Sequence, residues 1–359
     1  MKKGRRAAGF FDKIHAMKLK NTFFAFLLIA AVPAVAVESG ANPAADVRYA
    51  TDAYPGFDFE DGNAKPEKKE PRWFSFWFGP KMNDPAAQSG WAAKLETEGD
   101  VSGARKAYDA LVREWPTAPE ACKAQLKVAE LLVTERDYEE AFKEYRYLLD
   151  FYSSSCDFAA VTEEMYKLAE LMRAEGKTIV FFNFRNTVDV RRAYESLVLR
   201  APGAAFVPKA LLTIAELREE EDHLPEAVAV YENLRNLHPM SSEATEAAYR
   251  ESYARMKLVR RHEYNRNRVR DTAEYLEQVL GSGRLDEAKA AEVKSWSREI
   301  RLLQEDEAWK SASFYDSRTR TKRSAVNAYT AFLAEYPDGV HAEEARARLE
   351  ELKNGGELK

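Results

Sequence analysis

The sequence predicts an all-α fold, a solenoid of helical hairpins with about six repeat units. Apolar residues recur at steps of three and four from about residue 85 onward, the period of a helix with one buried face. A short tyrosine-centred pattern also returns at intervals near 37 residues. Only an apolar stretch around Phe181 has the character of a strand. A solenoid suits a chain of 359 residues, because each repeat contacts only its neighbours and no single large core is needed.

Five copies of the tyrosine-centred pattern mark the second helix of a repeat. Each copy has a small or β-branched residue, a tyrosine four positions later, and leucine or phenylalanine three positions after that. These steps place all three residues on one helix face, and the proline that follows four of the copies ends the helix. We therefore expect each tyrosine to lie in the seam between helices. The five tyrosines are Tyr108, Tyr145, Tyr194, Tyr231 and Tyr329.

A second pattern, an alanine between branched apolar residues, precedes the tyrosine pattern and marks the first helix. It is centred on Ala129, Ala169 and Ala215. The small alanine side chain lets a neighbouring helix approach closely. Two helices in a unit of about 36–37 residues form the tetratricopeptide arrangement.

The spacing between successive tyrosines shows where the array is interrupted. It runs 37, 49, 37 and then 98 residues. The interval of 49 holds an insertion at 177–186, between the two helices of the third repeat. The interval of 98 leaves room for a degenerate repeat at about 242–281 and a long helix at about 286–314. A final helix is expected at about 340–353.

Residues 1–36 have the features of a secretory signal peptide. A basic opening precedes an apolar run at 23–37, which ends in Ala34-Val35-Ala36, a small-x-small exit that a signal peptidase accepts. The alternative is a retained membrane anchor, which needs about 20 apolar residues. This run has about 15 with a proline inside, so we expect cleavage and export. Met1 and Met17 both stand as candidate start residues.

The rest of the chain divides into a linker, two blocks of repeats and a tail. We expect a flexible linker at 37–84, N-terminal repeats at 85–240, C-terminal repeats at 241–353 and a tail at 354–359. The linker contains an aromatic stretch at 73–78. That stretch either caps the apolar end of the first repeat or contacts a partner or a membrane surface.

Charge and cysteine content exclude several partners and attachments. Residues 1–36 carry seven lysines and arginines against one acid, so their removal shifts the formal charge from −5 to −11. An acidic surface argues against nucleic acid, whose binding depends on neutralising phosphates with basic side chains. The cysteines, Cys122 and Cys156, lie far beyond the apolar run, which excludes lipid attachment through a lipobox cysteine.

The order of repeats and the C-terminal block resemble the BamD family of outer-membrane assembly factors. The opening repeats at 104–116 and 122–152 carry part of the resemblance. The other part is a long helix ending in Glu305-Asp306-Glu307-Ala308-Trp309, followed by an aromatic Phe314-Tyr315 segment and a last repeat with Tyr336-Pro337-Asp338. The chain departs from the family in having no lipidated cysteine.

The resemblance implies a periplasmic protein that is peripheral at the outer membrane and belongs to the β-barrel assembly machine. It implies that the N-terminal repeats meet unfolded outer-membrane proteins. It also implies that the C-terminal repeats meet a POTRA domain of the barrel-assembly subunit. Attachment would then come from the partner complex or from the aromatic stretch.

No motif in the sequence indicates an enzyme, a metal site or a cofactor. The five histidines do not form a zinc pattern, and neither a phosphate-binding loop nor a nucleophile elbow is present. We therefore expect no catalytic residues, no metal and no cofactor. The helical superstructure of a lytic transglycosylase is the enzymatic alternative, and it would require a catalytic domain.

Recognition sites can be proposed from the repeat pattern. Glu130, Glu170 and Glu216 each follow a first-helix alanine and are candidates for a groove that holds a partner segment. A basic run forms either a solvated helix junction or a docking patch for an acidic partner. Its arginines are Arg260, Arg261, Arg266, Arg268 and Arg270. Cys122 and Cys156, each near the start of a first helix, form either a disulfide or two buried thiols.

Taken together, these features predict a non-enzymatic periplasmic scaffold that binds proteins during β-barrel assembly. The alternative is a cell-envelope scaffold that links the Tol–Pal system with peptidoglycan synthesis.

Overall fold

The computed structural model describes residues 79–174, 177–179, 182–184, 187–261, 265–318 and 322–354. All of them belong to one compact unit, Asn42–Lys359. The signal peptide expected at 1–36, the aromatic stretch at 73–78 and residues 355–359 lie outside the described part of the chain.

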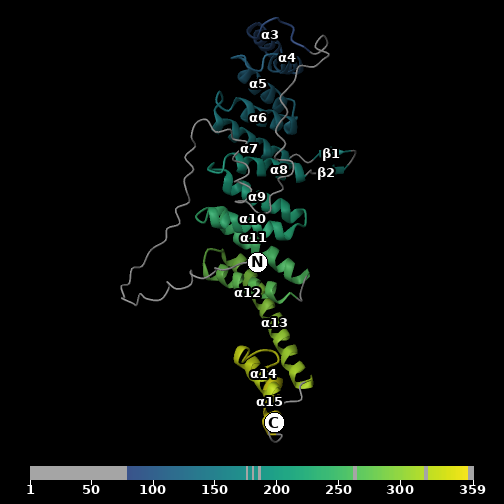
Figure 1. The fold of residues 1–359 in the computed structure, drawn as a ribbon, viewed down its shortest axis with the longest axis vertical. Coiled ribbons are helices and arrows are strands. Elements are labelled where there is room, and N and C mark those ends of the chain that lie inside the picture. The colour runs from purple at the N-terminus through teal and green to yellow at the C-terminus, as the bar shows by residue number, and fades with distance from the viewer. Residues whose placement is uncertain are drawn as a thin grey trace, which may run out of the picture. The chain divides into compact units, whose positions relative to one another are not determined.

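The described residues form thirteen helices and one short pair of strands, which Figure 1 shows in chain order. The helices of the first four hairpins are α3 (Pro85–Thr97), α4 (Val101–Glu114), α5 (Ala121–Thr134), α6 (Tyr138–Tyr152), α7 (Phe158–Ala174), α8 (Thr187–Arg200), α9 (Val207–Glu220) and α10 (Leu224–Leu237). The helices that follow are α11 (Ser242–Arg261), α12 (Arg266–Gly281), α13 (Glu287–Arg318), α14 (Lys322–Glu335) and α15 (Ala342–Asn354).

Each helix packs against the next one along the chain, which gives six hairpins from α3–α4 to α13–α14 and a last helix, α15. The odd-numbered helices are the first helices of the hairpins. Contacts also run from α9 to α11 and from α11 to α13, so first helices of successive hairpins touch. The predicted all-α, tetratricopeptide-like solenoid is confirmed.

The ends of the helices follow from local chemistry. Asp84, Asp100 and Asp137 each cap a helix by accepting a hydrogen bond from a backbone N–H in its first turn. At the other end, α4 and α10 stop immediately before Trp115-Pro116 and His238-Pro239, because proline cannot continue the hydrogen-bonded ladder.

The turns between paired helices use left-handed backbone at a fixed position. Gly99, Arg136 and Asp222 have φ of 84°, 61° and 65°, and each stands nine residues before a seam tyrosine. Glycine adopts this conformation without strain, whereas arginine and aspartate do so at a cost.

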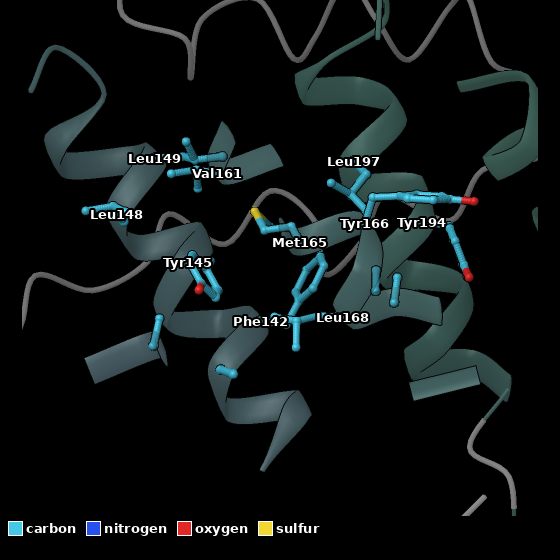
Figure 2. Packing of buried hydrophobic residues seen from close by; sticks show 14 of the residues in the cluster. Phe142, Tyr145, Leu148, Leu149, Val161, Met165, Tyr166, Leu168, Tyr194 and Leu197 are labelled. Atoms are coloured by element: carbon cyan, nitrogen blue, oxygen red, sulfur yellow. The ribbon is translucent and has the colours of Figure 1, made fainter. Parts of the chain in front are cut away.

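The five predicted seam tyrosines are buried, with at most 5% of any of them exposed. Figure 2 shows Tyr145 and Tyr194 among apolar side chains, including Phe142, Met165 and Leu197. The tyrosine pattern thus identified the interior face of the second helices correctly.

The insertion between α7 and α8 contains a small antiparallel hairpin, the one pair of strands among the described residues. Strand β1 (Lys177–Ile179) pairs with β2 (Phe182–Phe184), and Ile179 stands opposite Phe182. Such β-branched and aromatic residues favour strands, and the segment is too short for another helix of the array. Figure 1 shows the hairpin beside α7 and α8.

Buried apolar residues form three clusters along the array. The first extends without interruption from α3 to Ala247 on α11. The second joins α11, α12 and the first part of α13, from Met256 to Ile300. The third joins the end of α13 with α14 and α15. The long helix α13 therefore belongs to two clusters.

Candidate partner-binding face

The three predicted groove residues lie on first helices, each next to a fully buried alanine. Ala129, Ala169 and Ala215 are 0% exposed, while the glutamate that follows each of them is partly exposed. The turn of the helix moves a following side chain about 100° away from the packed face. The structure does not gather the three carboxylates, but joins each of them to other side chains of the array.

Glu170 on α7 is held by three groups. Its carboxylate accepts hydrogen bonds from the hydroxyls of Tyr194 (2.6 Å) and Tyr166 (3.1 Å), and Lys209 on α9 donates at 3.4 Å. Burial alone would raise the pKa of Glu170, but the Tyr194 hydrogen bond and the Lys209 charge outweigh burial and lower that pKa. This carboxylate is therefore ionised and paired at neutral pH.

Glu216 on α9 connects three successive first helices. Arg173 on α7 donates to its carboxylate at 2.6 Å, and Arg250 on α11 lies 3.4 Å away. Arg250 is also within 3.9 Å of Glu219 on α9 and donates to Glu246 on its own helix at 3.3 Å. One arginine thus ties the fourth and fifth repeats together.

Similar pairs continue in both directions along the first helices. Lys127 on α5 lies 3.0 Å from Glu130 and donates to Glu96 on α3 at 3.1 Å. Lys257 on α11 lies 3.6 Å from Glu219, and Lys289 on α13 donates to Glu246 at 2.6 Å. These contacts link α3 with α5, α9 with α11, and α11 with α13.

We name this set of ion pairs the first-helix ladder. Its acids are Glu96, Glu130, Glu170, Glu216, Glu219 and Glu246, and its bases are Lys127, Arg173, Lys209, Arg250, Lys257 and Lys289. Six carboxylates and six cations give the ladder no net charge. A partner that reaches this face must exchange these pairs or bind through uncharged contacts.

The seam tyrosines are connected to carboxylates of the first helices. Tyr108 donates to Glu96 and Tyr231 donates to Glu219, both at 3.2 Å and both across 12 residues of sequence. Tyr329 donates to Asp316 at 3.2 Å in the last hairpin. Burial and the Glu96 charge raise the pKa of Tyr108 to about 12, so this hydroxyl remains a donor at neutral pH.

An aromatic cluster lies where the ladder passes from α11 to α13. The rings of Tyr249 and Tyr253 are each 5.8 Å from the ring of Trp296. Tyr253 is 37% exposed and stands 37 residues after Glu216, which is one repeat length. Our sequence interpretation missed this cluster because the fifth repeat lacks the alanine pattern. Counting one repeat length from Glu216 could have found it.

The arginines of the predicted docking patch mostly pair with acids of the same chain. Arg260 donates to both carboxylate oxygens of Glu299 at 2.9 and 2.7 Å, and Arg261 does the same to Asp222 at 2.9 and 2.5 Å. Arg266 donates to a carboxylate oxygen of Glu307 on α13.

The remaining two arginines of the patch lie on α12. Arg270 pairs with Asp271 at 3.4 Å, and Arg268 is partly buried near the start of the helix. The basic run is also divided between two helices, because α11 ends at Arg261 and α12 begins at Arg266. Much of its charge serves to connect neighbouring repeats.

The two cysteines are close to each other with free thiols. The Cys122 thiol, at the start of α5, donates to the backbone oxygen of Ser155 at 3.4 Å, one residue before Cys156. Burial raises the pKa of both thiols, which keeps them protonated and unreactive at neutral pH. A disulfide between them stays a prediction.

The described residues contain no group of three or more histidine, cysteine or acidic side chains placed to hold a metal ion. Within the same ranges, no helix combines the length and the apolar character needed to cross a membrane.

No family model matches the chain, and no curated protein matches it. Solved structures with some similarity include a tetratricopeptide repeat protein from Parabacteroides merdae, which is 14% identical with a TM-score of 0.28 and covers 75% of this chain and 99% of its own. The C-terminal part of a TPR repeat-containing protein from Cytophaga hutchinsonii is 13% identical with a TM-score of 0.29, covering 74% of this chain and 88% of its own. PilF from Pseudomonas aeruginosa is 12% identical with a TM-score of 0.26, covering 74% and 97%.

Proposed function

We propose that this chain is a non-enzymatic periplasmic scaffold that binds other proteins during the assembly of outer-membrane β-barrel proteins. The observation that carries the proposal is the array of six helical hairpins, because stacked hairpins create extended surfaces for binding proteins. The expected export and the resemblance to outer-membrane assembly factors support the periplasmic location. We further propose that the protein is peripheral at the outer membrane and is held there by its partners.

The first-helix ladder and the aromatic cluster have different proposed roles in binding. The ladder runs from α3 to α13, has no net charge as a whole and consists of paired side chains, which suits transient contact with unfolded outer-membrane proteins. The aromatic cluster has Tyr253 partly exposed beside Trp296. Tyrosine and tryptophan are enriched among the residues that dominate binding energy, so this cluster is the stronger contact.

The C-terminal hairpin is the proposed contact for a POTRA domain of the barrel-assembly subunit. Phe314 and Tyr315 near the end of α13 are 58% and 44% exposed, and their ring centroids are 6.1 Å apart. Two adjacent aromatic rings that remain accessible fit a protein interface better than a solvated helix face.

Affinity purification from solubilised envelopes, followed by mass spectrometry, tests this proposal. The wild-type protein should recover the barrel-assembly subunit. Replacing both Phe314 and Tyr315 with alanine should abolish that recovery, whereas Leu302→Ala should not, although Leu302 is 53% exposed on the same helix. Recovery of Tol–Pal components instead would favour the cell-envelope scaffold and refute the assembly role.

Export and attachment can be measured separately. N-terminal sequencing of the mature protein should begin near Val37, and a product that keeps Met1 or Met17 would contradict the signal peptide. High salt should release the protein from envelope fractions, because interfacial charge pairs weaken when the screening length falls to about 3 Å near 1 M salt. If the protein stays with the membranes in high salt and is released only by detergent, a hydrophobic anchor such as the aromatic stretch at 73–78 holds it instead.

A further inference from the structure

Two arginines and one aspartate lie near one another on the second helices α6 and α8. Arg200 on α8 donates through both terminal nitrogens to the two oxygens of Asp150 on α6, the second bond being 3.3 Å. Its Nε also donates to Ser196 at 3.3 Å. A single arginine therefore occupies both oxygens of the Asp150 carboxylate.

The second arginine of this group, Arg146, lies one helical turn before Asp150. Its Nε is buried, and no side chain or backbone group in the described ranges accepts a hydrogen bond from it. Burial lowers the pKa of Arg146, the nearby Arg200 charge lowers it further, and Asp150 only partly opposes them. The cluster thus holds two cations and one anion in a partly buried place.

Another buried arginine shows how the same chain neutralises such a charge. Arg191 on α8 is 2% exposed, and both Glu195 (2.7 Å) and Glu221 (3.0 Å) pair with it. Removing a guanidinium from water without a partner is costly, whereas a carboxylate that accepts its hydrogen bonds offsets that cost. The group of Arg146, Arg200 and Asp150 has two cations but only one carboxylate, so one further carboxylate would neutralise it.

We propose that Arg146 and Arg200 form a binding site for a carboxylate, supplied by an aspartate or glutamate side chain of a protein partner. Arg146 is partly exposed although its Nε is buried, and the side chains of Arg200 and Asp150 remain 20% and 16% exposed, so a ligand can reach the edge of the cluster. The cluster carries one positive charge in excess, which matches a singly charged carboxylate. Asp150 would repel a doubly charged phosphate more strongly.

A neighbouring aromatic pair favours a peptide over a free anion. Phe151, one residue after Asp150, is 40% exposed and its ring lies 4.4 Å from the ring of Tyr147. A peptide with an apolar residue next to an acidic one can place its carboxylate on the arginines and its apolar side chain on the Phe151 ring. This inference rests on the proposed role in protein binding, but it concerns the second helices and not the first-helix ladder.

Titration of the full chain with a labelled, blocked oligoglutamate peptide at low ionic strength tests the site. Arg146→Gln should weaken peptide binding about tenfold, the equivalent of about 1.4 kcal/mol for losing charge-assisted hydrogen bonds. Arg105→Gln is the matched control, because Arg105 on α4 already pairs with Glu135 at 2.8 Å and should not affect binding. Arg146→Gln should also leave the melting temperature unchanged or raised, since no partner is lost.

Unchanged peptide binding by Arg146→Gln, or an equal loss in Arg105→Gln, would overturn the site. Competition by inorganic phosphate as effective as that by free glutamate would overturn the preference for a carboxylate. Envelope purification that recovers no assembly partner would defeat the proposed function alone, because the peptide titration does not depend on that partner.

Discussion

The N-terminal hairpins, α3 to α10, and the C-terminal ones, from α11 to α15, are built differently. In the first region, apolar residues form one continuous cluster, and the seam tyrosines are 37 residues apart except where the insertion lengthens the interval to 49. In the second region the apolar residues split into two clusters, and a single helix of 32 residues, α13, connects them.

Buried carboxylates lie on the helices where one apolar cluster ends and the next begins. Glu251 on α11 is 0% exposed, and it accepts hydrogen bonds from Arg235 (2.8 Å), Arg255 (2.7 Å) and Tyr275 (2.9 Å). Glu305 on α13 is 4% exposed and accepts a hydrogen bond at 3.0 Å from the backbone N–H of His341, next to α15. The difference lies in continuity: the apolar cluster is unbroken in the N-terminal hairpins, whereas at the two breaks farther along the array a buried carboxylate connects the helices.

The largest expected effect comes from breaking the regular seam. Tyr231→Ala should reduce the free energy of unfolding by about 3–5 kcal/mol, because the ring is fully buried and its loss leaves a cavity. Urea denaturation followed by circular dichroism measures this change. A loss below about 1 kcal/mol would mean that the seam does not hold the N-terminal repeats together.

A second, somewhat smaller effect is expected where the first apolar cluster gives way to the second. Glu251→Gln keeps the shape of the side chain but leaves Arg235 and Arg255 without their negative partner, at a cost of about 3 kcal/mol. Glu277→Gln on the exposed face of α12 is the control and should be neutral. If hydrogen exchange shows that Glu251→Gln loosens α4 as much as α12, the two regions do not unfold separately.

A third prediction concerns pH and the last helix. The hydrogen bond from Arg348 on α15 lowers the pKa of Asp316 on α13, and the Arg348 charge adds to that effect. Because the folded pKa lies below the unfolded value of 3.8, the pair stabilises the fold above that value and loses its effect as pH falls through the folded pKa. Arg348→Met should therefore lower stability at neutral pH by about 0.5–1 kcal/mol, a difference that disappears in acid. A difference independent of pH would show that packing, and not charge, is responsible.

The smallest effect is expected at the left-handed turn between α5 and α6. Arg136→Gly should stabilise the protein by about 0.5 kcal/mol, because glycine adopts the observed φ of 61° without steric cost. The reverse change, Gly99→Ala at φ 84°, should destabilise it by about 1 kcal/mol. Thermal denaturation gives the melting temperature of each variant. If both melting temperatures shift in the same direction, the two turns are not equivalent.

Sequence patterns located the helices along the whole array: the degenerate repeat expected at about 242–281 is α11 and α12, and the long helix expected at about 286–314 is α13. Helical periodicity and the tyrosine spacing located the hairpins and the third-repeat insertion, because both signals are local. The strand pair lies in the one stretch that had the character of a strand in the sequence, but its pairing was not predicted. Tyr275 and its bond to Glu251 were also missed, because the fifth repeat departs from the spacing on which the pattern depends.

The candidate site was harder to predict because its partners lie one repeat apart. Arg260 and Arg261 each pair with an acid 39 residues away, and Arg173 pairs with Glu216 across 43. A run of arginines therefore resembled a free patch when read locally. An acid near one repeat length from a base is the signal that could have revealed the ladder.

The neutrality of the first-helix ladder has a kinetic consequence. Electrostatic steering requires an excess of one charge, and the six acids and six bases of the ladder cancel. For a partner segment without net charge, which the overall charge of −5 neither attracts nor repels, we expect association at the unsteered rate of about 10⁵–10⁶ M⁻¹ s⁻¹. Affinity would then depend mainly on how long a complex survives, so that partners are selected by residence time and not by speed of arrival.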